Sequence, residues 1–199
     1  MFSGIVEAIG SIRSVSESGE GKRFAIAARF ADLALGESVC VSGVCLTVVG
    51  NEPGSFDVEV SCETLRRSKL GRLGPGHQVN LERSIRLSDR LSGHLVFGHV
   101  DGVGKLLSLT PEGDSQLYRF EPTEAVARYL VEKGSVSVDG VSLTVFECSD
   151  RSFTVAVIPH TARVTTLGSL KPGDPVNLES DMIAKYVEKF VSELAERRR

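Results

Sequence analysis

The sequence predicts an all-β protein: two tandem, homologous, six-stranded Greek-key barrels, followed by a C-terminal α-helix. The first observation is an internal repeat, because GVCLTV at residues 43–48 recurs as GVSLTV at residues 140–145. The second is that apolar and polar residues alternate in about six short runs per copy, which is the period of a β-strand. The third is that glycine-rich turns separate these runs at short intervals, which favours small closed barrels over an open sheet.

The repeat extends well beyond these six residues. Residues 38–48 match residues 135–145 in 8 of 11 positions, and residues 70–82 match residues 167–179 in 9 of 13. Two blocks that match at one constant offset indicate a duplicated domain, because low-complexity composition alone would not keep a register. We therefore expect three parts: a first barrel over 1–96, a second barrel over 97–181 and a terminal helix over 182–199.

In the first copy the alternating runs predict five stretches of strand, which cover residues 4–14, 24–28, 38–49, 56–60 and 78–85. The third stretch is broken at Ser42-Gly43, which predicts a hairpin turn and hence two strands. Residues 63–68 favour one helical turn, and the glycines of residues 71–76 indicate a turn.

The second copy is expected to repeat this order and to add one clear helix over residues 122–132. There Val126, Tyr129 and Leu130 fall on one side, and Thr123 stands where an N-cap is favoured.

The tail predicts an amphipathic helix with a narrow apolar seam, formed by Ile183, Val187, Phe190 and Leu194. Two arrangements are open from the residues alone. The helix could lie back on its own barrel, or it could form a short bundle between subunits.

Composition excludes several classes of function. The net charge of −3 gives no basic surplus for nucleic acid, and no apolar run is long enough to span a bilayer. The first residues have neither a basic region nor a long apolar region, so we expect no signal peptide and a cytoplasmic protein.

The four cysteines, Cys40, Cys45, Cys62 and Cys148, have no zinc-type spacing, so no metal site is expected. Cys40 and Cys45 lie at positions of opposite parity in one β-like run, which predicts side chains on opposite faces.

Small polar residues recur at matching places in both copies. The first copy has residues 3–6, 45–47 and 63–64, and the second has residues 98–100, 142–144 and 160–161. Backbone amides beside glycine, together with Thr hydroxyls, suit a flat heterocycle that carries a polyol side chain.

Several motifs resemble the riboflavin synthase family across essentially the whole chain: FSGIVE at residues 2–7, GVCLTV at 43–48, GHLVFGHVDG at 93–102, DGVSLT at 139–144 and IPHT at 158–161. Two positions depart from the family pattern. Ser3 stands where Thr is usual, and Ala162 stands where Leu is common.

This resemblance implies that each copy is a lumazine-binding barrel and that the protein is a homotrimer held by its C-terminal helices. It implies an enzyme that passes a four-carbon unit between two molecules of 6,7-dimethyl-8-ribityllumazine, which gives riboflavin and 5-amino-6-(D-ribitylamino)uracil. No cofactor is implied. The site would lie between the first barrel of one chain and the second barrel of its neighbour.

The resemblance also assigns site residues. Catalytic roles fall to Phe2, Cys45, His99, Ser142, Thr144 and Asp181. Substrate-binding roles fall to Gly4, Ile5, Val6, Cys45, Leu46, Thr47, Cys62, Glu63, Thr64, Gly98, His99, Val100, Lys133, Ser142, Leu143, Thr144, Ile158, Pro159, His160, Thr161, Ala162 and Arg163.

The chemistry asks for a group that removes a proton from a methyl group and for one that activates the second ring. His99 has a suitable intrinsic pKa for proton transfer, and Cys45 could act as a nucleophile or as a hydrogen-bond partner. His94, close in sequence to His99 but of opposite parity, is expected to be a structural hydrogen-bonding residue.

Two other functions stay open. Lumazine-type fluorescent antenna proteins resemble the same family but catalyse nothing, and in them a second site should have decayed. A twin barrel that only binds a partner should have no affinity for ribityllumazine.

Overall fold

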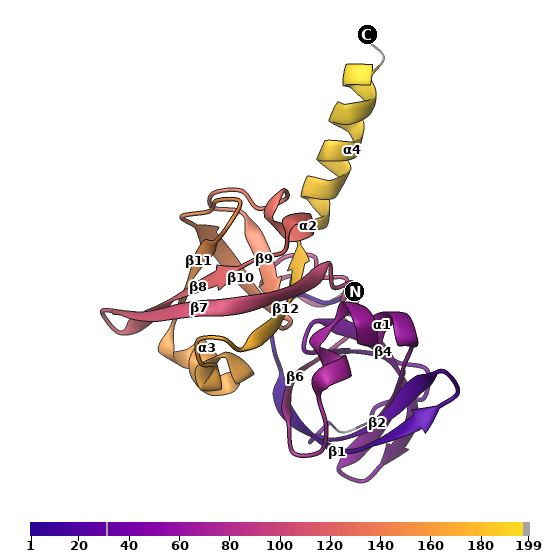
Figure 1. Ribbon diagram of the computed structural model, residues 1–199. Coiled ribbons are helices and arrows are strands. Elements are labelled where there is room, and N and C mark those ends of the chain that lie inside the picture. Colours follow the sequence, from indigo (N-terminus) through magenta and orange to yellow (C-terminus); the bar gives the residue numbers. More distant parts are fainter. Residues whose placement is uncertain (31, 197–199) are drawn as a thin grey trace.

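The computed structural model describes residues 1–30 and 32–196, and it contains two closed six-stranded antiparallel barrels side by side (Figure 1). The strands of the first barrel are β1 (Ala8–Ser18), β2 (Gly21–Ala27), β3 (Ser38–Val41), β4 (Val44–Glu52), β5 (Ser55–Val60) and β6 (Gln78–Arg83). Those of the second are β7 (Gly102–Glu112), β8 (Ser115–Glu121), β9 (Ser135–Val138), β10 (Val141–Phe146), β11 (Phe153–Val157) and β12 (Pro175–Ser180).

Both barrels have the same topology. The first runs β1-β2-β5-β4-β3-β6 and closes through β1 and β6, and the second repeats this order with β7 to β12. Three hairpin-linked strands, β3, β4 and β5, with β2 returning beside β5, are typical of a Greek key. The predicted fold class is confirmed.

Each barrel has its own apolar core, because one face of every strand points inward. The first core contains large side chains such as Phe24, Ile26 and Phe56, and the second contains Tyr118, Phe120 and Phe153. Stacking of Phe120 on Phe153, with ring centroids 5.4 Å apart, fixes the second core.

The segments that precede each barrel are exchanged between the two repeats. Val6, which precedes β1, packs against the core of the second barrel, whereas Val100, which precedes β7, packs against the core of the first. This exchange explains why the predicted strand over residues 4–14 begins only at Ala8. Gly4 and Val6 contact the second barrel, and the chain then enters β1 of the first.

A pseudo-twofold contact joins the barrels at two glycine turns. Gly43 and Gly140 both have positive φ, and a Cβ on Gly43 would lie 2.9 Å from the Gly140 amide nitrogen. On either side, Asn80 donates to the Asp139 carbonyl at 2.9 Å and Asn177 donates to the Ser42 carbonyl at 2.7 Å. The two turns therefore lie too close together to admit a side chain.

Short helices close the barrels. They are α1 (Cys62–Arg67) and η1 (Lys69–Arg72) in the first copy, with α2 (Glu124–Ala127), α3 (Pro159–Val164) and η2 (Thr166–Ser169) in the second. The predicted turn of helix over residues 63–68 is confirmed.

The helix predicted over residues 122–132 is wrong in length, because only Glu124–Ala127 is α-helical. Beyond Ala127 the hydrogen bonds are of the tighter i→i+3 kind, from Tyr129 to Val126 and from Leu130 to Ala127. The chain must then turn into β9, and Lys133, with φ of 64°, makes that turn. Thr123 does precede the helix, but its hydroxyl makes no capping bond.

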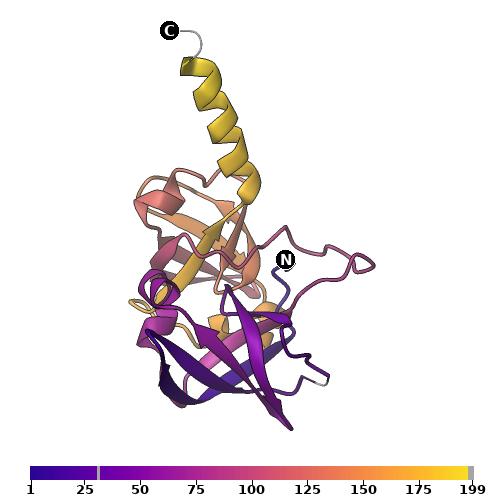
Figure 2. The same cartoon turned by 90° about the vertical axis from the view of Figure 1, so that its right-hand side faces the viewer.

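The terminal helix α4 (Met182–Glu196) projects away from both barrels (Figures 1 and 2). It does not lie back on its own barrel. Its base is held by ion pairs of Lys185 with Asp101, at 2.6 Å, and of Arg128 with Glu188. The side chain of Leu194, part of the predicted seam, lies outside the described residues.

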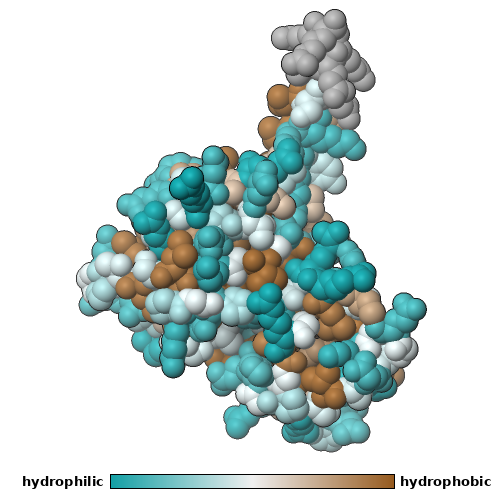
Figure 3. All heavy atoms as spheres, in the orientation of Figure 1, coloured by the Kyte–Doolittle hydropathy of each residue, from teal (hydrophilic) through white to brown (hydrophobic). Residues whose placement is uncertain are grey.

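Apolar side chains on α4 face solvent. Figure 3 shows apolar atoms along the projecting helix. Ile183, Tyr186, Val187, Phe190 and Val191 are between 55% and 64% exposed. Among the described residues, no helix is both long enough and apolar enough to cross a membrane.

Candidate functional site

One cavity collects predicted binding residues from both copies. It has a volume of about 240 Å³ and lies between β4, α1 and the segment that precedes β7. Its lining consists of Val44, Cys45, Glu63, Thr64, Arg67, Ser68, Gly98, His99 and Val100. We call it the Cys45 cavity.

The exchange of segments builds this cavity. The Cys45 amide donates to the Gly98 carbonyl at 2.9 Å, which sets the segment 98–100 against β4. Gly98 has φ of 77°, and a Cβ there would lie 2.6 Å from the Cβ of Cys45. Only glycine fits this approach, so the glycine in the motif FGHV has a steric reason.

A buried carboxylate holds the same segment from behind. Glu179 accepts hydrogen bonds from the amides of Phe97, at 2.7 Å, and His99, at 2.9 Å. Burial raises the pKa of Glu179, and these amide donors act in the opposite direction.

The second barrel has the matching arrangement. The Ser142 amide donates to the Gly4 carbonyl at 2.8 Å, and a Cβ on Gly4 would lie 2.6 Å from the Cβ of Ser142. Glu82 accepts from the amides of Ser3, at 2.6 Å, and Gly4, at 3.0 Å. The sequence reasoning grouped residues 3–6 with Cys45 and residues 98–100 with Ser142, and the structure reverses both pairings.

Glu82 and Glu179 were missed by the sequence reasoning. The signal was present, because both end the repeated block VNLE at residues 79–82 and 176–179. Carboxylates are rarely buried unless they are paired or hydrogen-bonded. An acidic residue that recurs at the same place in an otherwise apolar strand therefore indicates a buried hydrogen-bond acceptor.

Ser142 differs from Cys45 in having a buried histidine as partner. The His94 Nδ1 lies 2.7 Å from the Ser142 hydroxyl, so His94 is a hydrogen-bonding residue, as predicted. Burial lowers the pKa of His94, although the Asp181 carboxylate opposes this, so the imidazole is held toward its neutral form.

The prediction for the faces of Cys40 and Cys45 is wrong. The turn at residues 42–43 makes them direct cross-strand partners, which places both side chains on one face. They pack there with Phe2 and Val96, whose backbones pair in an isolated bridge.

The other predicted residues of the second copy are spread over several places. Pro159, Ala162 and Arg163 line a separate cavity of about 300 Å³. Asp181 lines a further cavity of about 460 Å³ at the base of α4. Lys133 lies over the ring of Phe146, with Nζ 5.6 Å from the centroid.

The remaining predicted residues lie on the strands and helices already described. Leu46, Thr47, Leu143 and Thr144 follow Cys45 and Ser142 on β4 and β10, Cys62 begins α1, and Ile158, His160 and Thr161 lie at the start of α3. Thr47 and Thr144 are both exposed. No single one of these cavities is lined by both Cys45 and Ser142.

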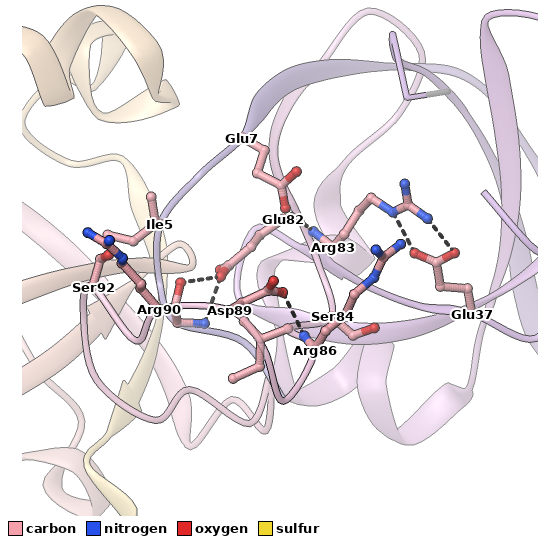
Figure 4. A pocket seen from close by; sticks show the side chains of 12 residues that line it. Ile5, Glu7, Glu37, Glu82, Arg83, Ser84, Arg86, Asp89, Arg90 and Ser92 are labelled. Atoms are coloured by element: carbon pink, nitrogen blue, oxygen red, sulfur yellow. Dashed lines mark hydrogen bonds and ion pairs between the residues drawn. The ribbon is translucent and has the colours of Figure 1, made fainter. Parts of the chain in front are cut away.

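A fourth hollow lies beside the connection between the barrels, which extends as a loop in Figure 2. This pocket, of about 480 Å³, contains Ile5 among charged side chains (Figure 4). In it the Arg83 guanidinium pairs with the Glu37 carboxylate at 2.6 Å, and Glu82 accepts from the backbone amides of Ser3 and Gly4. The pocket suits a neutral heterocycle less well than the Cys45 cavity, where a thiol and hydroxyls face the space.

Two closed barrels with matched polar sites define a small-molecule-binding protein with a duplicated domain. The lumazine-binding domain model matches residues 3–84 and 97–181. A riboflavin synthase of Mycobacterium tuberculosis is 46% identical over 197 residues, which cover 96% of this chain and 98% of the relative. A riboflavin synthase of Actinobacillus pleuropneumoniae is 44% identical over 96% of this chain and 90% of the relative.

Solved structures agree with the fold. LumP complexed with 6,7-dimethyl-8-(1'-D-ribityl) lumazine superposes with a TM-score of 0.79 at 25% identity. The match covers 90% of this chain and 99% of LumP. The chain belongs to the riboflavin synthase family, with a lumazine-binding domain in each half, as the sequence motifs predict.

Proposed function

We propose that this protein is a riboflavin synthase. It converts two molecules of 6,7-dimethyl-8-ribityllumazine into riboflavin and 5-amino-6-(D-ribitylamino)uracil by transfer of a four-carbon unit. The observation that carries the proposal is the Cys45 cavity, in which a thiol and hydroxyls of the first repeat face the same space as an imidazole of the second. The identity to riboflavin synthases over 96% of the chain supports it.

The duplication fits this reaction. Two identical substrates require two similar sites, whereas the donor and the acceptor must be treated differently. The two sites differ where the chemistry would occur: Cys45 corresponds to Ser142, and His99 corresponds to Ile5.

We assign the first substrate to the Cys45 cavity. The thiol of Cys45 lies on β4, and His99 stands on the segment that Glu179 fixes. The exposed imidazole of His99 can accept or return a proton of the substrate methyl group, since an imidazole nitrogen can serve as a general base or acid. Glu63 and Thr64 on α1 offer hydrogen bonds to the polyol chain.

We assign the second substrate to the Ser142 and Thr144 face, with Gly4 to Val6 as its edge. His94 orients the Ser142 hydroxyl at 2.7 Å. The neutral imidazole of His94 can accept a hydrogen bond from the Ser142 hydroxyl. The lone pairs of the serine oxygen are then free to accept a hydrogen bond from the ring or from an attacking water. Holding two oriented substrates together can lower the barrier by roughly 7–11 kcal/mol.

We also propose a homotrimer in which the two faces meet between neighbouring chains. The exposed apolar side chains of α4 support this, since an apolar stripe of this kind is typical of a helix that packs against a partner. The functional division is then residues 1–96, 97–181 and 182–199, the last an oligomerisation helix. We propose a cytoplasmic location, which suits the four free cysteines.

The test is incubation of the purified chain with 6,7-dimethyl-8-ribityllumazine alone. We expect the absorbance and green fluorescence of riboflavin to appear, with one uracil product for each riboflavin. Tight binding without turnover would favour the antenna protein instead. Absence of binding would favour a twin barrel that only contacts a partner.

A further inference from the structure

The pairing of Cys40 with Cys45 across the β3–β4 hairpin carries a consequence for the site. The two residues are direct partners in the antiparallel register. Val41 and Val44 form the pair that closes the turn, and Cys40 and Cys45 form the next pair along the two strands. The Cys45 amide donates to the Gly98 carbonyl and therefore points away from β3. Cys40 and Cys45 are thus a non-hydrogen-bonded pair.

Non-hydrogen-bonded pairs are the closest positions in an antiparallel ladder. Their Cα atoms lie about 4.5 Å apart, within the range of about 4.4–6.8 Å that a disulfide spans. Both side chains are on the outer face, because they pack with Phe2 and Val96 rather than in the core of the barrel. The backbone therefore already holds these two side chains on one face, at a pairing position whose Cα separation a disulfide can span.

We propose that Cys40 and Cys45 form a reversible cross-strand disulfide that switches the site off. The bond would draw the Cys45 sulfur from the wall of the cavity toward Cys40. The effect on turnover rests on the proposed function, whereas formation of the bond does not.

The two cysteines have different roles in the exchange. Cys45 is partly exposed and lines the cavity, so a small disulfide can reach it, whereas Cys40 is 2% exposed. Burial raises the pKa of the Cys40 thiol, and the Glu82 carboxylate adds to this. Cys45 is therefore the thiol that reacts with the external disulfide, and Cys40 is the resolving thiol.

The reaction balances with a low-molecular-weight disulfide such as oxidised glutathione as the oxidant. The Cys45 thiolate attacks one sulfur, its S–S bond breaks, and one thiolate leaves and takes up a proton. Cys40 then loses its proton to solvent, attacks the Cys45 sulfur and releases the second thiolate. Two cysteine thiols are oxidised, and one disulfide is reduced to two thiols.

The second repeat acts as an internal comparison. Its matching pair is Ser137 and Ser142, which are direct partners in the same register. The hydroxyl of Ser137 is buried without a hydrogen-bond partner, and Ser142 bonds to His94. Only the first barrel therefore carries the thiol pair.

Intact mass and thiol counting test the proposal on the full-length protein. After treatment with oxidised glutathione, we expect the mass to fall by two hydrogens and two of the four thiols to remain open to alkylation. Cleavage between the two cysteines should leave the fragments joined until a reductant is added. A stable glutathione adduct on Cys45, a bond to Cys62 or Cys148, or four unreacted thiols would each overturn the proposal.

Variants make the result independent of activity. Cys40→Ala removes the resolving thiol, so we expect oxidation to stop at a single glutathione adduct on Cys45. The double change Ser137→Cys and Ser142→Cys copies the pair into the second barrel and should yield a second disulfide. If that variant does not fold, the Cys40→Ala result still decides. Loss of two hydrogens from Cys40→Ala would overturn the pairing.

Riboflavin formation provides the separate functional readout. We expect the oxidised wild-type protein to lose most of its turnover and to regain it with dithiothreitol. A protein that carries the Cys40–Cys45 bond but keeps full turnover would overturn the switch. A reduced protein that makes no riboflavin would instead contradict the proposed function and leave the mass results unaffected.

Discussion

The ammonium of Lys69 and the carboxylate of Asp139 form a buried ion pair across the boundary between the two barrels. The pseudo-twofold counterparts of these residues are Thr166 and Ser42, which carry no charge. Burial raises the pKa of Asp139, whereas Lys69 acts in the opposite direction. The boundary therefore carries one charged pair, and the equivalent positions on the other side of the pseudo-twofold axis are uncharged.

Lys69→Thr should destabilise the protein strongly, because it leaves the Asp139 carboxylate buried without its cation. Removal of one partner of a buried pair costs roughly 3–5 kcal/mol. The double change Lys69→Thr and Asp139→Ser copies the uncharged residues Thr166 and Ser42 of the other side and should recover much of that loss, because no buried charge is then left unpaired. The midpoints of chemical unfolding check this. A double variant no more stable than the single one would contradict the explanation.

Glu179→Gln should loosen the segment that bears His99. The two amides bind different oxygens of the Glu179 carboxylate, so a glutamine would keep an acceptor for one of them and turn its NH₂ group toward the other. An unsatisfied buried donor costs about 1–3 kcal/mol, and we expect a higher KM for lumazine with a smaller effect on kcat. Glu82→Gln is the matched variant on the other repeat, where the segment with Gly4 should loosen instead.

The same variant predicts a pH dependence. Because burial raises the pKa of Glu179 above its ordinary value, the folded protein holds that proton more tightly than the unfolded chain. The stability this group contributes is present at acid pH and is lost as pH rises through its folded-state pKa. The stability of wild type minus that of Glu179→Gln should therefore fall as the pH rises above the ordinary carboxyl pKa of about 4.5. A difference that rises with pH there would contradict the assignment.

Gly98→Ala should disturb the Cys45 cavity more than an equally strained glycine elsewhere. The new Cβ would lie 2.6 Å from the Cβ of Cys45, in addition to the cost of a positive φ. Gly173→Ala is the control, since it has φ of 99° but no atom within 4 Å of the added Cβ. Strain alone costs of order 1–3 kcal/mol. We expect lumazine affinity to fall for Gly98→Ala and to be retained for Gly173→Ala, as titration of ligand fluorescence would show.

The sequence predicted the barrels well because repetition and alternation are local signals. The hairpin at Ser42-Gly43 and the helical turn near Glu63 follow from residue types within a few positions. The exchange of segments could not be found this way. Whether Val6 packs on the first core or on the second depends on contacts between the barrels. The periodicity of apolar residues along the chain carries no information about such contacts.

The prediction that Cys40 and Cys45 lie on opposite faces failed for a related reason. Parity counts along one strand, but a two-residue turn reverses the chain and pairs residues on either side of it. The turn itself was predicted, so the pairing was available from the sequence once the register was followed through it. The positions of Glu82 and Glu179, in contrast, needed only attention to the repeated block.

Substitution of the exposed apolar residues of α4 should separate assembly from folding. We expect Val187→Lys with Phe190→Lys to shift the mass in solution from that of the proposed trimer to that of a single chain, because charges would replace exposed apolar side chains of α4. Both barrels should keep their cores, since neither apolar core includes a residue of α4. Light scattering gives the mass, and near-ultraviolet circular dichroism reports the packing of the cores.

Lys189→Gln changes an exposed polar residue of the same helix and should leave the mass unchanged. If the site forms between chains, the variant with Val187→Lys and Phe190→Lys should no longer form riboflavin, while its Cys45 cavity should still bind lumazine. That result would follow because the Ser142 face of the neighbouring chain is then missing. A single chain with full turnover would instead place both substrates within one molecule, and the exchanged segments would have to complete both sites alone.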